Sequence, residues 1–403
     1  MKSTAAVYLY QYISLHVGTL KFFDIWLYKP KSILSFKFWF YWFKQVIVGI
    51  LIYIIPTTGQ IIYLIEICVS GNAGIQDIAA IVNLVSTEML ATYKLIHFHF
   101  HRNAVRQLLN ELNNNEFHCF DGSHKKIIDK GIKFSRRLFT AFMISAACDV
   151  FVHVIVVPGL KGFKYLPLKM DLVFFDITDS KYFNYICAYQ ILYKPMMVST
   201  YMSLQALPWA FMIFAINQLD ILIKKLQNIE DLVKETKQLT GLNDEEAFKS
   251  VFKDCILHYF AILRNIKILQ KALGGQLSST LFISVIILCN TAVQIFSIES
   301  PHKNITEVFW VLTYLFIFVL NLFLDCYFGN EITVKSSYLS TAIYNSPWLK
   351  LSKGVKKNIA IFIFIAQQPV TLRAANLAPV SVATFTTVMN WTYKAFAVMN
   401  QMK

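Results

Sequence analysis

Seven apolar stretches, each long enough to cross a lipid bilayer, constrain the fold of this chain more than any other feature of its sequence. A spanning helix needs about 20 residues, because each residue adds about 1.5 Å and the hydrocarbon core is about 30 Å thick. The stretches lie at residues 38–67, 75–96, 138–157, 182–217, 277–298, 308–327 and 380–402. Pro56 falls inside the first stretch and is expected to bend it. The pattern predicts an all-α, polytopic membrane protein with seven transmembrane helices.

The composition argues against a soluble protein. Charged residues make up 15% of the chain and hydrophobic residues 56%, whereas soluble domains carry about 25% charged residues. The net charge of +14 would suit a nucleic-acid partner in a soluble protein, but in a membrane protein it is typical of basic cytosolic loops. No nucleic acid is therefore expected. The sequence contains no phosphate-binding loop, dinucleotide fingerprint or HExxH motif, and neither an enzyme nor a cofactor is predicted.

The distribution of basic residues predicts the orientation in the membrane. Lys and Arg concentrate in the N-terminal segment and in the connections after the second, fourth and sixth spans, and are sparse in the other connections. Because cytosolic loops carry the excess of basic residues, we expect the N-terminus inside and the C-terminus outside, the reverse of G-protein-coupled receptors. The sequon at Asn304 then falls in an outer loop, where it is a glycosylation candidate.

This topology divides the chain into four parts. Residues 1–37 form a cytosolic N-terminal segment, and residues 38–327 form a six-span bundle with a ligand pocket in its outer half. The connections at 98–137 and 218–276 repeat apolar residues at helical spacing and are expected to be cytosolic helical extensions, with a disordered tip at 235–246. Residues 328–379 hold a cytosolic anchor helix and the return to the membrane, and residues 380–403 form the last span.

The last span carries a polar stripe along one helical face. At helical spacing the stripe contains Thr384, Thr387, Trp391, Lys394, Val398 and Gln401, while aromatic and methionine residues gather on the opposite side. Lipid cannot satisfy polar groups, so this face must contact protein or water. Two interpretations remain open from the spacing alone: packing between helices through Thr and Gln side chains, or the lining of a water-filled pore.

The outer halves of four spans are rich in aromatic, methionine and small polar residues, which suits a pocket for a small apolar ligand. The candidates are Asn83, Leu84 and Thr87 in the second span, Val150 and His153 in the third, Tyr185, Tyr189, Tyr193, Met196, Met197 and Thr200 in the fourth, and Tyr314 and Phe318 in the sixth. Asp149 lies one turn before His153, and the two either line a cavity or form a structural pair. The same residues would also suit an ordinary core.

Histidines and cysteines point to little further chemistry. His97 and His101 would share a helical face, but the sequence offers no third metal ligand nearby, so no metal site is predicted. Cys68 and Cys187 both fall near the outer face in the predicted topology. This placement is compatible with a disulfide but does not require one.

The C-terminal part of the chain contains a series of motifs in a characteristic order. They are Cys326 and Gly329, Ser336-Ser337, Ala342-Ile343-Tyr344, Trp348, Lys356-Lys357, Gln367 with Pro369, Ala378-Pro379, Phe385, and Thr392-Tyr393 followed by Phe396. Upstream, Lys94, Arg102 and Gln218-Leu219-Asp220 fit the same pattern. With these residues and the seven-span topology, the chain resembles the insect odorant receptor family.

The resemblance implies a ligand-gated, non-selective cation channel subunit in the plasma membrane of a sensory-neuron dendrite. It implies a heterotetramer with the odorant receptor co-receptor, surrounded by lipid, in which the last spans line the pore. A small volatile odorant, mostly apolar, would occupy the outer half of the helix bundle. The end of the chain matches the end of the co-receptor without gaps, which implies that Val398 takes the gate position and Gln401 the outer polar ring. The resemblance therefore favours pore lining over simple packing.

Lys394 departs from the family pattern, which has a small or polar residue at this position. Four copies would surround a cation path with four ammonium groups, so we expect one copy of this chain beside three of the co-receptor. Two alternative functions compete with this interpretation. A gustatory-type receptor channel would place its closing Gln nearer to Tyr393, and a secondary transporter would show inverted repeats, which we do not find in the sequence.

Overall fold

The computed structural model describes residues 4–26, 36–71, 74–118, 122–160, 162, 165–172, 180–298, 305–374 and 378–401. The described chain is almost entirely helical. Its α-helices are α1 (Thr4–Leu9), α2 (Ser14–Phe22), α3 (Phe36–Gly49), α4 (Ile55–Ser70), α5 (Ile75–Phe100), α6 (Arg102–Glu111), α7 (Gly122–Phe151), α8 (Val157–Leu160), α9 (Ser180–Gln227), α10 (Ile229–Thr240), α11 (Asp244–Ser297), α12 (Ile305–Tyr344), α13 (Lys353–Ala366) and α14 (Val382–Gln401). Two short strands, β1 (Arg373–Ala374) and β2 (Ala378–Pro379), pair in antiparallel fashion just before α14. The sequon residue Asn304 lies outside the described residues.

Six helical segments of the described chain are long and apolar enough to cross a membrane. They are Trp39–Ser70, Ile75–Phe100, Gly122–Gly159, Tyr182–Gln227, Asp244–Ser297 and Val308–Tyr344. To within one residue, each covers one of the first six predicted spans, which confirms the all-α polytopic class. The seventh span corresponds to α14, whose 20 residues cover about 30 Å at 1.5 Å per residue. Because its sequence is more polar, α14 is not among these six segments.

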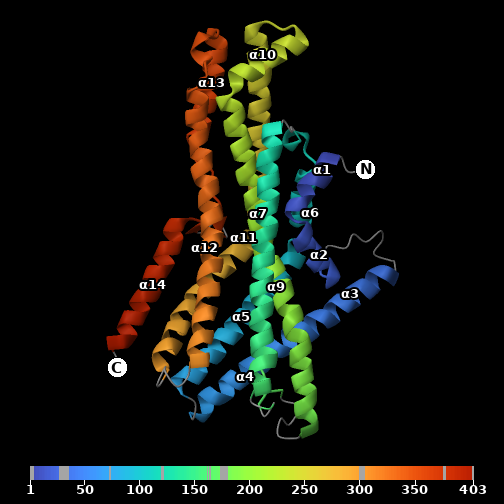
Figure 1. Ribbon diagram of the computed structural model, residues 1–403, viewed down its shortest axis with the longest axis vertical. Coiled ribbons are helices and arrows are strands. Elements are labelled where there is room, and N and C mark those ends of the chain that lie inside the picture. Colours follow the sequence, from blue (N-terminus) through green and yellow to red (C-terminus); the bar gives the residue numbers. More distant parts are fainter. Residues whose placement is uncertain are drawn as a thin grey trace.

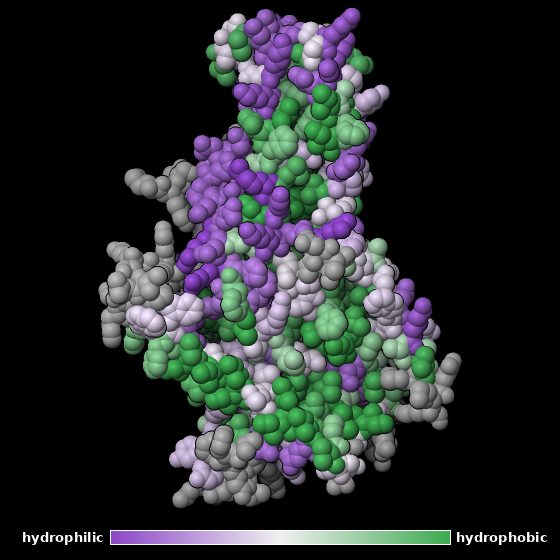
Figure 2. Space-filling view, turned by 180° about the vertical axis from the view of Figure 1, so that it is seen from behind, coloured by the Kyte–Doolittle hydropathy of each residue, from purple (hydrophilic) through white to green (hydrophobic). Residues whose placement is uncertain are grey.

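The long helices extend well beyond the apolar part of the molecule. In Figure 1, α9, α11 and α12 run along most of the long axis, and α10 and α13 lie beside their upper ends. Figure 2 shows hydrophobic side chains covering the lower half of the visible face, with hydrophilic side chains gathering above. The predicted extensions at 98–137 and 218–276 are largely helical. The first is formed by α6 and part of α7, and the second by the end of α9, α10 and the first part of α11.

The prediction of a disordered tip at 235–246 is wrong. Helix α10 continues to Thr240, and Gly241 ends it in the left-handed conformation at φ 71°, which glycine adopts at low cost. The side chain of Asn243 then accepts a 2.8 Å hydrogen bond from the backbone N–H of Glu246 and caps the start of α11. The acidic residues of this segment suggested disorder. In the structure Asp244, Glu245 and Glu246 lie in the first turn of α11, where negative charge interacts favourably with the positive end of the helix dipole.

Two spans contain a π-helical turn shortly before a proline. The turn Ile50–Ile54 precedes Pro56, and the turn Val152–Val156 precedes Pro158. Proline lacks the N–H that would bond the carbonyl four residues earlier, and its ring collides with that carbonyl, so the helix widens locally. A π-helical turn thus lies before Pro56, where a bend was expected, and a second one occurs in the third span.

The N-terminal helices dock into the bundle rather than lying loose. Helix α2 packs against α7 and α9, and its His16 is 2% exposed, with its ring centroid 4.2 Å from that of Phe139. Burial lowers the pKa of His16 to about 3, because the charged imidazolium would lose its hydration. His16 is therefore neutral at ordinary pH and behaves as part of the core. Elsewhere in the bundle, Cys68 and Cys187 carry free thiols and form no disulfide.

A close approach joins α12 to the start of α14. Gly329 on α12 lies so near Val380 that a Cβ at residue 329 would be 2.3 Å from the Val380 carbonyl oxygen. The backbone N–H of Val380 also donates a 2.8 Å hydrogen bond to the carbonyl of Leu372, which holds the β1–β2 hairpin in place. Glycine at 329 therefore allows the chain to turn back along α12 before α14 begins.

We expect Gly329→Ala to destabilise the protein by about 1–3 kcal/mol, because the clash is with backbone that cannot rotate away. Melting of the purified protein in detergent would measure the change. Gly354→Ala in α13 is the matched control, since a Cβ at that position meets nothing within 4 Å. Equal melting temperatures for the two variants would contradict this account of the approach.

Candidate ligand site

A cavity of about 320 Å³ lies inside the bundle, among α5, α7 with its π-helical turn, α9 and α12. We call it the central cavity. It is lined by Ala80, Ile81, Leu84, Thr87, Ala146, Asp149, Val150, His153, Val154, Pro167, Leu168, Lys169, Lys194, Val198, Tyr201, Met202, Trp310, Tyr314, Ile317, Phe318 and Asn321. Most of these side chains are apolar, and the volume is at the lower end of the range for small-molecule pockets.

The structure brings six of the predicted ligand-binding residues together at this cavity. They are Leu84, Thr87, Val150, His153, Tyr314 and Phe318. Asp149, one turn before His153, also lines it, so this pair lies at the cavity wall rather than in a solid core. His153 Nε2 is 3.6 Å from the Asp149 carboxylate, and the His153 ring packs against Trp310 with centroids 3.4 Å apart. That these residues contact a ligand stays a prediction.

The other seven candidates lie away from the central cavity. They are Asn83, Tyr185, Tyr189, Tyr193, Met196, Met197 and Thr200. On α9, the face that carries Tyr189 and Thr200 turns toward the first span: the Tyr189 hydroxyl donates to the carbonyl of Leu51, and Thr200 bonds Tyr53. Tyr185 is 75% exposed. The face of α9 that reaches the cavity instead carries Lys194, Val198 and Tyr201.

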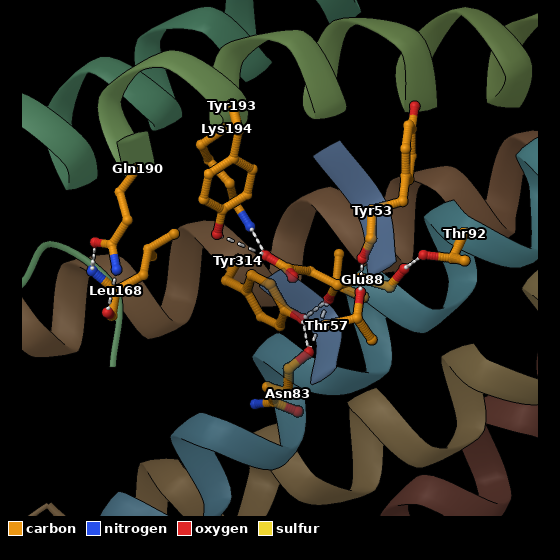
Figure 3. Close-up of polar contacts among 11 residues, drawn as sticks. Tyr53, Thr57, Asn83, Glu88, Thr92, Leu168, Gln190, Tyr193, Lys194 and Tyr314 are labelled. Atoms are coloured by element: carbon orange, nitrogen blue, oxygen red, sulfur yellow. Dashed lines mark hydrogen bonds and ion pairs between the residues drawn. The ribbon is translucent and has the colours of Figure 1, made fainter. Parts of the chain in front are cut away.

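Most polar side chains around the cavity wall form hydrogen bonds or ion pairs within the protein (Figure 3). Lys194 pairs with Glu88 at 2.6 Å, and the Tyr193 hydroxyl also donates to Glu88, at 3.5 Å. The hydroxyls of Thr87 and Tyr314 are 2.6 Å apart, and that of Tyr314 also donates to the backbone carbonyl of Asn83. Asn83 itself is buried and donates to Thr291 and Gln294 on α11, so it braces two helices instead of facing a ligand.

A segment of the connection before α9 covers part of the cavity. Pro167, Leu168 and Lys169 line it, and the Gln190 side chain forms two hydrogen bonds with the Leu168 backbone, at 2.8 and 2.9 Å (Figure 3). Lys169 also pairs with Asp77 at 2.7 Å. The covering segment is therefore fixed to α9 and α5.

A second hollow of about 530 Å³ lies between α7, with its π-helical turn, and α12. It shares Asp149, His153, Trp310 and Ile317 with the central cavity. Its rim includes Phe309 and Phe316, both largely exposed on the outer surface of the bundle. The His153–Trp310 contact therefore stands between the central cavity and the outer surface.

Sequence reasoning did not single out Lys194, Tyr201, Trp310 or Asn321, which all line the cavity. One available signal was helical spacing on the sixth span, because Trp310, Tyr314 and Phe318 follow one another at four-residue intervals. No comparable signal existed for Tyr201, because nearly every position of α9 is buried between Tyr201 and Leu222. A helix buried on all sides shows no periodicity that separates a cavity wall from a solid core.

The polar stripe on α14 is exposed in the single chain. Thr387, Trp391, Lys394 and Val398 are all exposed, whereas Val388 and Thr392 on the other side are buried. Helix α14 packs through this other side against α11 and α12, with Phe385 and Phe323 in an edge-to-face contact at 5.5 Å. Gln401 ends the helix, and its side chain is outside the described structure.

The paired histidines form no metal site with other described residues. The rings of His97 and His101 stack with centroids 3.9 Å apart. Within the described chain, no group of three or more His, Cys, Asp or Glu side chains is placed to hold an ion. We therefore assign no metal chemistry to this end of α5.

A many-span helical bundle with a mostly apolar cavity between its helices is compatible with a membrane receptor for small molecules. Residues 75–393 match the sequence profile of the family described as 7tm Odorant receptor, so the chain belongs to the odorant receptor family. Odorant receptor 46a, isoform A, of Drosophila melanogaster is 23% identical over 329 residues, covering 81% of this chain and 82% of that protein. Odorant receptor 85f of the same species is 28% identical over 138 residues, covering 33% of this chain and 34% of that protein.

The fold matches a solved member of the same class. The insect olfactory receptor OR5 from Machilis hrabei superposes with a TM-score of 0.82 at 17% sequence identity, covering 99% of this chain and 100% of that chain. The same receptor in complex with eugenol gives a TM-score of 0.81. Together with the family match, this identifies an insect odorant receptor of the membrane, not an enzyme.

The buried ion pair beside the cavity provides a test of the site's architecture. Lys194→Met would leave the Glu88 carboxylate, which is 1% exposed, without its cation. We expect a loss of about 3–5 kcal/mol in unfolding free energy, because an uncompensated buried charge is costly. Thermal melting in nanodiscs would measure it.

Two further variants separate this effect from a general loss of packing. The double variant Glu88→Leu with Lys194→Met should recover most of the stability, since it removes both charges. Lys169→Met breaks an exposed pair with Asp77 and should change stability by less than about 1 kcal/mol. If Lys194→Met melted like the parent protein, the pair would not be a structural element.

Proposed function

We propose that this receptor binds a small, mostly apolar volatile in the central cavity and opens a cation pore formed by the last helices of a tetramer. The observation that carries the proposal is the cavity itself, about 320 Å³ and lined mostly by apolar side chains between four membrane helices. The related OR5 receptor has been solved in complex with eugenol, which supports a small organic ligand for a bundle of this shape.

Burial would supply most of the affinity. Each Å² of apolar surface removed from water contributes about 25 cal/mol, so a molecule of odorant size gains several kcal/mol without any hydrogen bond. Such binding tolerates variation in shape but depends on the volume available. The lining residues Leu84, Val150, His153 and Phe318 would therefore set the size of the ligand, and Thr87 and Tyr314 its orientation.

The exposed stripe of α14 supports a role in the pore. Lys394 cannot face hydrocarbon at low cost, yet no other part of the described chain covers it. Further subunits and a water-filled path would satisfy its charge. Val398 would form the closed gate, where a ring of aliphatic side chains excludes ions by dewetting, with Trp391 on the same stripe and Gln401 beyond it as a polar ring.

The charge of Lys394 argues for an unequal assembly with the co-receptor. Two unit charges about 8 Å apart repel by about 2 kcal/mol at an effective dielectric of 20, and a ring of four contains several such pairs. A passing cation would meet all of them. One copy of this chain with three of the co-receptor avoids that barrier, so this chain would choose the ligand and the co-receptor would form most of the pore.

The proposed topology completes this arrangement. Residues 1–37, the extensions at 98–137 and 218–276, and residues 328–379 would lie in the cytosol, the last forming the anchor. Residues 38–327 would hold the ligand pocket, and residues 380–403 would line the pore with the C-terminus outside. The receptor would act in the plasma membrane of a sensory-neuron dendrite. Staining of a C-terminal epitope on intact cells tests the orientation directly.

We expect Leu84→Ala to raise the half-maximal concentration of activating odorants by about tenfold when the receptor is expressed with the co-receptor, because buried apolar contact is lost. Odorant-evoked currents across a volatile panel would measure the shift, with surface expression recorded in parallel. Leu192→Ala is the control, since Leu192 is exposed on the outer surface of α9. Equal potencies for the parent and Leu84→Ala would place the ligand elsewhere.

Expression of this chain without the co-receptor should give no odorant-evoked cation current. In the heteromer, Lys394→Thr should leave conductance unchanged or raise it, because it removes a positive charge from the cation path. Single-channel recording measures both. A robust current from this chain alone would refute the unequal assembly, as would loss of current in the Lys394→Thr heteromer.

A further inference from the structure

The inner end of the central cavity is closed by two polar side chains that have no hydrogen-bond partner among the described residues. The hydroxyl of Tyr201 on α9 is buried and unpartnered, as are both amide atoms of Asn321 on α12. The two residues are 4% and 1% exposed, and both line the cavity. We call this pair the polar floor.

The polar floor differs from the rest of the cavity wall. Thr87 and Tyr314 bond each other, Lys194 pairs with Glu88, and Lys169 pairs with Asp77. Tyr201 and Asn321 are the only lining residues whose buried side-chain polar atoms lack a partner within the described chain. Native proteins rarely leave such groups unsatisfied, because an unpaired buried donor or acceptor is destabilising. Unpaired groups at a cavity wall therefore point to a partner that enters the cavity.

Position along the helices explains why these two groups face the ligand side. Tyr201 and Asn321 each precede, by one helical turn, a residue of a buried charged layer: Gln205 on α9 and Asp325 on α12. The Gln205 side chain accepts a hydrogen bond from the Lys94 ammonium and donates to the Asp325 carboxylate. Lys94 also lies over the ring of Tyr201, 5.5 Å from its centroid, and so holds that ring in place without using its hydroxyl.

We propose that the polar floor binds the oxygen function of the odorant, so that the receptor selects apolar volatiles with a neutral hydroxyl or carbonyl at one end over hydrocarbons of the same shape. This inference rests on the proposed function. The Asn321 amide offers a donor and an acceptor, and the Tyr201 hydroxyl offers both, so either oxygen type can be bonded. A carboxylate end group would have to be desolvated in an apolar cavity whose two lysines, Lys169 and Lys194, are already paired with Asp77 and Glu88.

The test compares 1-octanol, 2-octanone and octane, which have similar shapes but differ in the oxygen. Concentration–response curves would be recorded with the co-receptor, and ligand-dependent melting would be measured on the purified receptor in nanodiscs. We expect the two oxygenated compounds to be about tenfold more potent than octane or better, since a buried site that can bond oxygen discriminates against an analogue that lacks it.

Two volume-matched variants identify the residues. Asn321→Leu and Tyr201→Phe should lower the potency of 1-octanol and 2-octanone toward that of octane and leave octane unchanged. Asn321→Leu should also melt at the same temperature as the parent protein without ligand, or higher, because it removes an unsatisfied amide. A residue with only a structural role would lower the melting temperature and affect all three compounds alike. Leu84→Ala, which changes volume and not polarity, should weaken all three together.

Each outcome decides the matter. Equal potency of octane and 1-octanol on the parent receptor, or an undiminished preference in both variants, would overturn the polar floor while leaving the ligand cavity intact. If none of the three compounds evoked current or changed melting, the cavity would fail as the odorant site, and the proposed function and this inference would fall together.

Discussion

The bundle depends on a charged layer buried between four membrane helices. Lys94 on α5 and Asp325 on α12 are almost completely buried, and Gln205 on α9 bridges them by accepting from the ammonium and donating to the carboxylate. Trp209 on α9 also donates to Asp325, while Thr280 and Gln276 on α11 bond Gln205 and the Lys94 backbone carbonyl. Charges inside a membrane bundle are tolerated only when they are paired. The register of α5, α9, α11 and α12 is therefore fixed at this level.

One end of the central cavity and the contact with the last helix both lie one helical turn from that layer. One turn before the layer along α9 and α12, Tyr201 and Asn321 line the central cavity. One turn after it along α12, Gly329 lies against Val380 at the start of α14. Asn321, Asp325 and Gly329 follow one another at four-residue intervals and share one face of α12. The fixed layer thus connects the cavity to the helix proposed to line the pore through a single rigid element, with no flexible segment between them.

The sequence predicted the parts of this structure that obey strong, local rules. Membrane-length apolar stretches defined the six long spans, and the motif series from Cys326 onward correctly indicated the odorant receptor family. Prediction from the sequence failed where packing between helices determines which side chains line the cavity. Tyr193 and Met197 were predicted to bind ligand, but both are buried in the hydrophobic core and do not line the central cavity. Asn321 was not predicted as a site residue, and it is distinguished only by its place in the cavity wall and its lack of a hydrogen-bond partner among the described residues. The composition of residues 235–246 predicted disorder, yet Gly241 ends α10 and the Asn243 side chain caps the start of α11, so the segment is ordered.

The position of the polar floor bears on how a ligand could act as well as on which ligand binds. A ligand shifts an equilibrium only by its difference in affinity between two states, so an agonist must contact something that moves on opening. Apolar contacts at Leu84 or Val150 fill volume in much the same way in any arrangement of the helices. Hydrogen bonds are far more sensitive to distance and angle, and those at Tyr201 and Asn321 would span α9 and α12. A small displacement of α12 relative to α9 would make or break them, and the same displacement would carry Gly329, and with it Val380 and the start of α14. The residues that distinguish an oxygenated ligand are thus the cavity residues best placed to couple binding to movement of the last helix.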